Sequence, residues 1–533
     1  MRFHVLLLFS LLAPALAQTP NADDLVWQKA VHKFDAARAA FLRQVDTGGQ
    51  TGPFRPNWDS LKHYQVPTWY QDAKFGIFLH WGVYSVPAFG NEWYPRNMYN
   101  QGTPEFAHHV ATYGPQTKFG YKDFIPMFKA EKFDAKAWAD LFRKAGAKYV
   151  IPVAEHHDGF AMYNTDLSDW CAAKMGPRRD TTGELAQAVR AAGLHFGVSS
   201  HRAEHYFFLN TGREIDSDVR DPRFAAFYGP AHAGVTDKNG ARWQAHPDAA
   251  YLDDWMARAA ELVVKYQPEI LWFDWWIETK EFAPYRQRLA AFYYNDAARR
   301  GSTAAINYKD DAFPTNAAVL DIERGQSDQI LPYFWQTDTS VSIKSWGYIE
   351  NDTFRSPESL VQELVDIVSK NGALLLNVGP KSDGTIPEQA KDVLLAMGHW
   401  LSTNGEAIYG TRPWKISGEG PTKVVGGSFN DTATKPYTGQ DIRFTTRGGL
   451  LYAIALARPR DGKIRIQSLA RGSKAMDWEV AGVQLLGSRD KLKWTRDASG
   501  LEIEMPATQT GEFAWVFRIT RAGRKPGTSG PGN

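Results

Sequence analysis

The chain has 533 residues, which exceeds one typical domain and predicts two. Its 61 Lys and Arg residues nearly balance 59 Asp and Glu residues, and the net charge of +2 favours neither nucleic acid nor an anionic membrane as a partner. Aromatic residues make up 13% of the chain, including 19 Trp, which is more than core packing usually demands and favours a cleft that binds a neutral carbohydrate.

The N-terminus has the features of a secretory signal peptide over residues 1–17. Arg2 supplies the positive charge, Val5–Leu12 an apolar segment, and residues 15–17 read Ala-Leu-Ala, a small-x-small cleavage pattern. The apolar segment is shorter than the ~20 residues that span a bilayer, so cleavage after Ala17 is expected, with no membrane span left. The mature protein is therefore predicted to be periplasmic or secreted. Because Cys171 is the only cysteine, no intrachain disulfide can form, and this thiol is interpreted as structural or incidental.

From about Phe75 to Asn377, short apolar segments alternate with amphipathic helical patterns. The clearest helix is Phe133–Ala145, which Asp134 can cap, and the strand-like segment Tyr149–Val153 follows it. The same order recurs in four further units, in which the helix and the strand cover residues 184–192 and 195–198, 251–266 and 270–273, 282–300 and 304–306, and 357–370 and 373–378. This repetition predicts an α/β fold, a (β/α)8-like (TIM-type) barrel, in a catalytic domain that covers residues 18–410.

The pattern changes after Trp400. Alternating segments such as Leu450–Leu456 and Phe513–Ile519 are separated by Gly, Asp and Pro turns, as in antiparallel strands. They predict a C-terminal antiparallel β-sandwich over residues 411–522. Residues 523–533 are rich in Gly and Pro and are expected to form a disordered tail.

Polar residues follow several of the predicted barrel strands. Asp274 comes directly after Ile270–Phe273, His80 follows an apolar strand, and His156 and His157 follow another. The carboxyl ends of barrel strands form the catalytic face, so these side chains are expected to share one rim. A helix cap is the alternative role for Asp274, and a hydrogen-bonded core position is the alternative for any one histidine.

The histidines allow two interpretations, a metal site and a sugar site. Consecutive residues such as His156 and His157 point in opposite directions on an extended chain, and neither of these two begins a His-x-Glu or His-x₃-His spacing that would help to complete a zinc shell. Neutral imidazoles suit a sugar because each offers one donor and one acceptor to hydroxyl groups. A sugar site without a metal is therefore preferred.

Several motifs in series resemble those of the retaining α-L-fucosidases of glycoside hydrolase family 29. The resemblance extends from about Trp69 to Trp414, in the same order. The stretches that carry it are Phe75–Pro87, Glu92–Tyr94, His156–Phe160, Trp272–Asp274, Leu374–Pro380 and Asp383–Pro387.

This resemblance implies a catalytic barrel followed by a β-sandwich, and an exo-acting enzyme that releases terminal fucose from a fucosylated glycan without a cofactor. It implies that Asp274 is the nucleophile that forms a covalent fucosyl-enzyme. The residues that it places around fucose are His80, Glu92, Trp93, His156, His157 and Trp272. Imidazoles and Glu92 suit the ring hydroxyls, and the aromatic surfaces suit the C6 methyl group.

A retaining glycosidase also needs a second carboxyl group, ~5 Å from the nucleophile, as acid and base. Glu323 is the preferred candidate because it ends an apolar segment, and its separation of 49 positions from Asp274 leaves room for a βα unit. Glu278 and Glu350 are alternatives, and an ion pair near Arg324 is the non-catalytic role for Glu323.

The chain departs from the family at two places. Residues 199–201 read Ser-Ser-His where many members have tyrosines, so His201 or another loop is expected to replace a tyrosine contact to fucose. Residues 335–338 read Trp-Gln-Thr-Asp in place of Trp-Glu-Thr-Cys, and Trp335 is predicted to flank the leaving group.

Three other functions stay open. They are a catalytically silent fucose-binding protein, a retaining glycosidase for a related sugar such as L-galactose, and a metal-dependent hydrolase. The intact Asp274 argues against the first. The sequence makes no prediction of oligomeric state.

Overall fold

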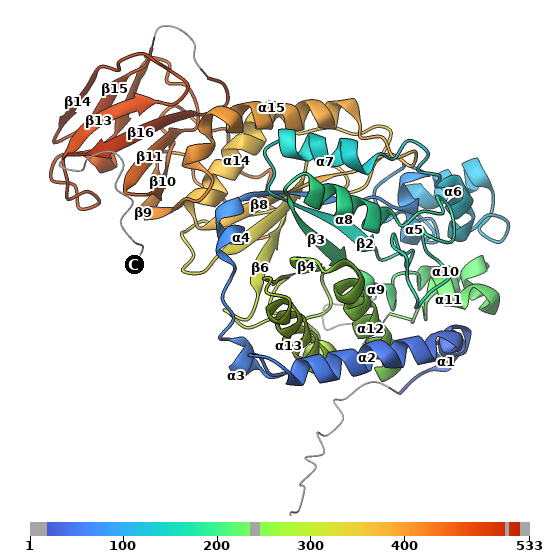
Figure 1. Ribbon diagram of the computed structural model, residues 1–533. Helices are drawn as coiled ribbons and strands as arrows, with labels where there is room; N and C mark the ends of the chain where they lie inside the picture. Colours follow the sequence, from blue (N-terminus) through green and yellow to red (C-terminus); the bar gives the residue numbers. More distant parts are fainter. Residues whose placement is uncertain (1–18, 235–245, 507–510, 523–533) are drawn as a thin grey trace, which may run out of the picture.

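The computed structural model describes residues 19–234, 246–506 and 511–522, which form a barrel and a neighbouring β-sandwich (Figure 1). The predicted signal peptide and C-terminal tail lie outside the described residues. The predicted boundary after residue 410 falls between α15 (Glu388–Asn404), which ends the barrel domain, and β9 (Arg412–Glu419), the first strand of the sandwich.

Eight parallel strands form a closed barrel in chain order, and β8 pairs with β1. Most of them are short, largely apolar segments that are buried on both faces, as parallel strands require. This confirms the predicted fold class. The strands are β1 (Phe75–Leu79), β2 (Tyr149–Glu155), β3 (His195–Ser200), β4 (Ile270–Phe273), β5 (Ala305–Tyr308), β6 (Val319–Glu323), β7 (Trp335–Ser340) and β8 (Gly372–Val378).

Long helices connect most of these strands. Residues 135–144 form a helix as predicted, and the Asp134 side chain accepts a hydrogen bond from Ala137 N at its first turn. The barrel helices are α4 (Thr68–Ala73), α5 (Tyr94–Asn97), α6 (Pro104–Tyr113), α7 (Ala135–Lys144), α8 (Thr181–Ala191), α9 (Arg202–His205), α10 (Thr211–Glu214), α11 (Ala225–Tyr228), α12 (Ala249–Tyr266), α13 (Ala283–Arg299) and α14 (Pro357–Ser369). Before them come α1 (Ala22–Val31), α2 (Asp35–Gln50) and α3 (Trp58–Leu61), of which α2 packs against α12 and α13.

No α-helix forms between β5 and β6 or between β6 and β7. These connections contain Pro314 and Pro332 and are too short and polar to form an apolar helical face. The barrel therefore lacks its usual helical cover beside β6, which carries Glu323.

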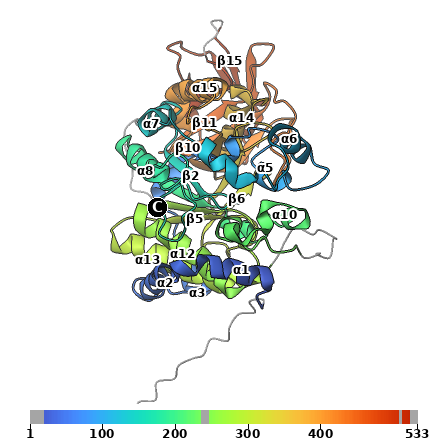
Figure 2. The ribbon, with the colours of Figure 1, turned by 90° about the vertical axis from the view of Figure 1, so that its right-hand side faces the viewer.

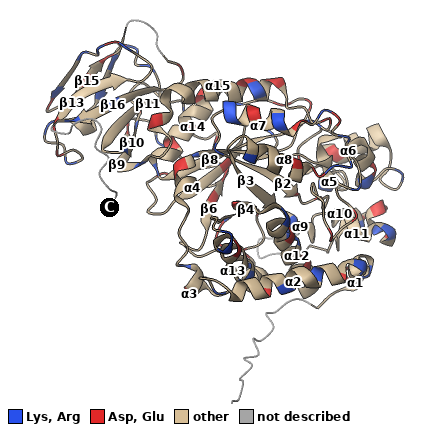
Figure 3. Ribbon diagram, viewed as in Figure 1, with Lys and Arg blue, Asp and Glu red and all other residues tan. Residues whose placement is uncertain are grey.

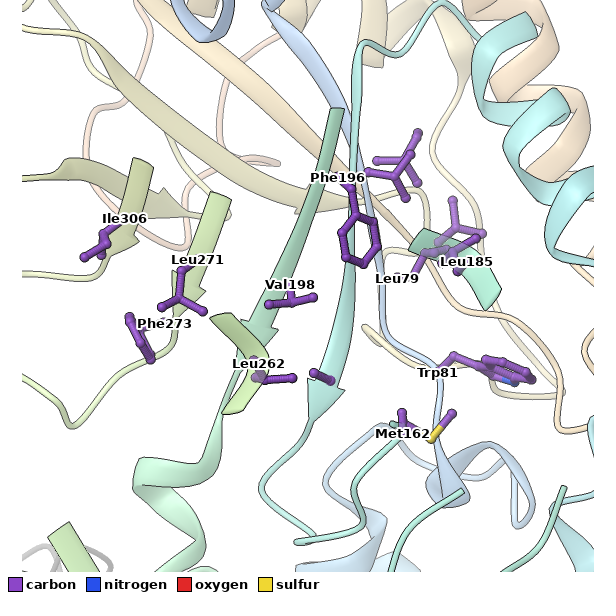
Figure 4. Close-up of a cluster of buried hydrophobic side chains, with 14 of the residues drawn as sticks. Leu79, Trp81, Met162, Leu185, Phe196, Val198, Leu262, Leu271, Phe273 and Ile306 are labelled. Atoms are coloured by element: carbon purple, nitrogen blue, oxygen red, sulfur yellow. The ribbon is translucent and has the colours of Figure 1, made fainter. Parts of the chain in front are cut away.

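Alternating strand residues face the helices and the barrel interior. Figure 4 shows outward-facing residues of β3 and β4, including Phe196, Val198 and Leu271, in a cluster with Leu185 of α8 and Leu262 of α12. Inward-facing residues form a separate cluster with members on six of the strands; it includes Phe78, Tyr149, Ile151, Ile270, Trp272, Ala305, Val319 and Leu375. Residues two positions further along these strands also point inward, at the rim of the barrel.

The C-terminal domain is an antiparallel β-sandwich of a five-stranded and a three-stranded sheet, with sheet orders β13-β16-β11-β10-β9 and β12-β15-β14. Its apolar core lies between the two sheets. In Figures 1 and 2, α14 lies between the barrel and the sandwich, and the buried Arg443 of β10 donates to Asp366 of α14. The remaining strands are β10 (Ile442–Arg447), β11 (Leu450–Ala455), β12 (Lys463–Ile466), β13 (Val480–Leu485), β14 (Trp494–Asp497), β15 (Gly500–Glu504) and β16 (Trp515–Arg521).

Acidic and basic residues are interspersed on the outer helices, without a stripe of one sign (Figure 3). Within the described part of the chain, no helix combines the length and the apolar character needed to cross a membrane.

Candidate active site

A cavity of about 540 Å³ opens at the carboxyl ends of the barrel strands. Aromatic rings and titratable side chains share its wall, as in sites that hold the apolar faces and the hydroxyls of a sugar. The lining residues are His80, Glu92, Trp93, His156, His157, His201, Glu204, Trp272, Asp274, Trp275, Trp276, Glu278, Glu323, Asp338, Trp346 and Phe429.

Strand alternation explains how the deepest residues reach this cavity. Trp272 faces the barrel interior, so Asp274, two residues later, also points inward. The same relation places His80 two residues after the inward-facing Phe78. All six residues predicted to surround fucose line this one cavity, whereas Trp335, predicted to flank the leaving group, does not.

Asp274 is held by two imidazoles. Its Oδ2 accepts a hydrogen bond from His201 Nδ1 at 2.8 Å and lies 3.4 Å from His157 Nε2. Burial by itself would raise the pKa of Asp274, but these imidazoles hold it well below its usual range. Asp274 is therefore a carboxylate with one oxygen fixed by donors and Oδ1 left for chemistry.

The two imidazoles differ in charge. Burial opposes protonation of His157, but Glu204, 3.1 Å from its Nδ1, and Asp274 raise the pKa of His157 to about 9. For His201, burial outweighs the effect of Asp274 and lowers the pKa. His201 is therefore neutral, donates through Nδ1 to Asp274, and accepts at Nε2 from Ser199 Oγ at 3.0 Å.

His80 and His156 are also neutral, because burial holds the pKa of each well below its usual value. His80 Nδ1 lies 2.8 Å from Asn377 Oδ1, whose amide nitrogen donates to Trp346 O, so His80 donates through Nδ1 and presents Nε2 as an acceptor. The buried Nδ1 of His156 has no hydrogen-bond partner among the described residues. Both rings can therefore bind a hydroxyl of a ligand.

Glu323 lies at the end of β6, and the intervening unit between it and Asp274 is α13 with β5, as predicted. Its Oε2 accepts a hydrogen bond from Trp275 Nε1 and lies 3.7 Å from Lys309 Nζ. Burial and the negative charge of Asp274 raise the pKa of Glu323, although Lys309 opposes this shift. The surroundings of these two carboxyl groups therefore shift their pKa values in opposite directions. The shift favours the ionised form of Asp274 and the protonated form of Glu323.

Of the two alternatives to Glu323 as acid and base, only Glu278 lies at the cavity. Glu278 also lines the cavity, and burial raises its pKa to about 7. Glu350 is exposed and lies outside the cavity lining. Glu278 therefore stays a candidate acid on geometric grounds, and Glu350 does not.

Two groups of side chains in the described ranges could hold a metal ion, with ligand atoms within 4.8 Å of one another. They are His80 with His156 and His201, and His157 with His201 and Asp274. Both groups belong to the cavity, and the second contains imidazoles already engaged with carboxylates. The same nitrogen atoms suit the hydroxyls of a sugar.

The model of the α-L-fucosidase family matches residues 41–406, and that of the α-L-fucosidase C-terminal domain matches residues 430–520. Human tissue α-L-fucosidase is 30% identical over 478 residues, which cover 88% of this chain and 92% of that protein. Human plasma α-L-fucosidase is 32% identical and covers the same share of this chain and 92% of its own length. The chain belongs to the α-L-fucosidase family.

The fold matches solved α-L-fucosidases as well. The Thermotoga maritima α-fucosidase in complex with fucose superimposes with a TM-score of 0.69 at 33% identity, covering 88% of this chain and 100% of that one. The same enzyme was also solved with a mechanism-based inhibitor, again at 33% identity and a TM-score of 0.69. These matches include both the barrel and the sandwich.

The structure contradicts the predicted position of Trp335. Its ring is fully buried outside the cavity, and its Nε1 donates to Lys370 O, because the first residue of β7 faces the outer helices of this α-L-fucosidase. Trp346 lies at the cavity instead, where its ring is 5.1 Å from that of His80 and its backbone N donates to Glu92 Oε2 at 2.8 Å.

Other lining residues were absent from the predicted site. Glu204 follows β3, so the strand-end rule could have found it together with His201. No local sequence pattern places Trp346 or Phe429 at the cavity, because both lie in long connections whose folded path decides their position. His201, at the place of the family tyrosines, contacts the carboxylate of Asp274.

Proposed function

We propose that this chain is an exo-acting retaining α-L-fucosidase that hydrolyses terminal α-L-fucosyl linkages of glycans. The observation that carries the proposal is that the carboxyl groups of Asp274 and Glu323 line one cavity. The imidazoles beside Asp274 hold its pKa well below the usual range, whereas burial and the charge of Asp274 raise the pKa of Glu323. Membership of the α-L-fucosidase family supports it.

In the first step, Asp274 Oδ1 attacks the anomeric carbon and the bond from that carbon to the leaving oxygen breaks. Glu323 gives its proton to this oxygen, so the leaving group departs as an alcohol. His201 and His157 hold Oδ2, which orients the carboxylate for attack by its other oxygen.

In the second step, water attacks the same carbon and Asp274 leaves as a carboxylate. Esterification has removed the negative charge that raised the pKa of Glu323, so Glu323 now accepts the proton of that water. Two displacements restore the starting configuration, and no cofactor takes part.

The cavity suits a deoxy sugar with several hydroxyls. His80 Nε2 and His156 Nδ1 are available to hydroxyl groups, and the charged His157 can donate to another. Trp272 and Trp346 supply apolar surface for the ring and the C6 methyl group. Glu92 acts by holding the Trp346 backbone.

The test follows hydrolysis of 4-nitrophenyl α-L-fucoside by proton NMR. We expect α-L-fucose to appear before its β anomer, since double displacement retains configuration. The matching α-L-galactoside adds a hydroxyl where fucose has a methyl group, and its kcat/KM is expected to be ~10- to 200-fold lower. β-L-Fucose as the first product would exclude this mechanism, no turnover would favour a binding protein, and preference for the galactoside would reassign the sugar. Loss of turnover with a chelator would favour the metal-dependent alternative.

We also propose export, from the signal-peptide pattern of residues 1–17. Expression of the full chain in a Gram-negative host is expected to place it in the periplasm with Gln18 at its N-terminus. Mass spectrometry of the purified protein checks this. An intact Met1 on cytoplasmic protein would contradict export.

A further inference from the structure

The loop between β9 and β10, residues 420–441, leaves the sandwich and reaches the catalytic barrel at the end of β6. Phe429 N donates to Glu323 O at 2.8 Å, and Asp431 N donates to Arg324 O at 2.8 Å. Gly427 N donates to Gln326 O at 2.9 Å. The C-terminal domain therefore pairs its backbone with the segment that carries the proposed acid and base.

Close packing and a buried carboxylate hold this loop in place. A Cβ added at Gly325 would lie 1.9 Å from Gly427 O, so only glycine allows the two chains to approach so closely. The side chain of Asp431 is only 7% exposed. It accepts a hydrogen bond from Thr339 Oγ1 at 2.7 Å and lies 3.6 Å from guanidinium nitrogens of Arg324 and Arg355. The loop is thus anchored on both sides of Phe429.

Phe429 itself stays open to solvent at the cavity. Phe429 is 63% exposed although it lines the same cavity as Glu323 and Trp275. Its backbone has a φ of 60°, a conformation that residues other than glycine rarely adopt. The anchored loop therefore holds the Phe429 ring at the cavity, where the ring is exposed and does not pack into the hydrophobic core.

We propose that Phe429 forms the leaving-group subsite, where its ring stacks on the apolar face of the pyranose to which fucose is attached. The inference rests on the proposed function, in which Glu323 is the acid that protonates the leaving oxygen and must therefore lie on the leaving-group side. Phe429 is hydrogen-bonded to the backbone of Glu323 and so lies on the same side. Aromatic rings bind the C–H face of a sugar, whereas the imidazoles of the fucose pocket bind hydroxyls. The C-terminal domain thereby contributes to substrate choice.

The test compares two substrates in the full chain. One is the disaccharide of α-L-fucose with galactose or N-acetylglucosamine that the parent hydrolyses fastest, and the other is α-L-fucosyl fluoride, which has no leaving-group ring. Phe429→Ala is expected to lower the ratio of kcat/KM on the disaccharide to that on the fluoride by about 5- to 10-fold. Phe429→Tyr, which keeps a flat ring, is expected to keep this ratio within about twofold of the parent.

Val425→Ala is the matched control, because Val425 is an exposed apolar residue of the same loop outside the cavity lining. It is expected to keep the parent's ratio. An unchanged ratio in Phe429→Ala, or an equal fall in Val425→Ala, would overturn the subsite. If the parent hydrolysed neither substrate, the proposed function would be overturned, and the subsite with it. Equal melting temperatures of the variants exclude a folding effect.

Discussion

Replacing Asp274 by alanine is expected to lower kcat/KM on 4-nitrophenyl α-L-fucoside by about 10⁴-fold, ~5 kcal/mol of transition-state stabilisation. The reason is that the attacking oxygen is lost, and Glu204, the other carboxyl group beside His157, lies at Nδ1, on the opposite edge of the ring from Asp274. Initial rates of the parent and the variant measure this effect. Circular dichroism and thermal melting should show both proteins folded.

Azide provides a positive test of the same role. It fits the space that the Asp274 carboxylate leaves and attacks the anomeric carbon directly, so Asp274→Ala with azide should give β-L-fucosyl azide, with inverted configuration. Asp311→Ala is the matched control, since Asp311 is an exposed acid in the loop after β5, outside the cavity lining. Parent-like activity in Asp274→Ala would sink the mechanism.

Replacing Glu323 by alanine is expected to affect substrates according to their leaving groups. A disaccharide needs a proton on its leaving oxygen, and loss of general acid catalysis should lower kcat/KM by about 10²- to 10⁴-fold. 2,4-Dinitrophenyl α-L-fucoside needs little protonation, so formation of the fucosyl-enzyme should be nearly unaffected. Azide should then intercept that intermediate and give α-L-fucosyl azide, the anomer opposite to the product from Asp274→Ala.

The pH profile tests Glu323 independently. The first step needs ionised Asp274, whose pKa is lowered, and protonated Glu323, whose pKa is raised. Parent kcat/KM should therefore fall on the acidic side as Asp274 gains a proton and on the basic side as Glu323 loses one. Glu323→Ala should abolish the basic fall.

Glu278→Ala and Glu350→Ala are the comparison variants for this assignment. Glu278 lines the cavity with a pKa raised to about 7 and is the rival acid, whereas Glu350 lies outside the cavity lining. The acid and base would be reassigned to Glu278 if Glu278→Ala, and not Glu323→Ala, lost activity mainly on the disaccharide and gave α-L-fucosyl azide with azide.

The sequence by itself determined the barrel, the sandwich and most of the inward-facing polar residues. Short apolar strands and amphipathic helices are local patterns, and a polar residue directly after a strand must lie at the barrel rim. This rule placed Asp274, His80, His156 and His157 correctly at the cavity. The family resemblance added Glu92, Trp93 and Trp272, which also line it.

Only the tertiary structure decided the features that depend on contacts between distant segments. Trp335 faces the helices because its register in β7 fixes its direction, and Trp346 takes the cavity position through a hydrogen bond to Glu92, 254 residues away. The charges of Asp274 and Glu323 depend on neighbours from other strands, which sequence spacing does not reveal. Phe429 reaches Glu323 only because a loop of the second domain pairs with β6, at the part of the barrel where the connecting helices are absent.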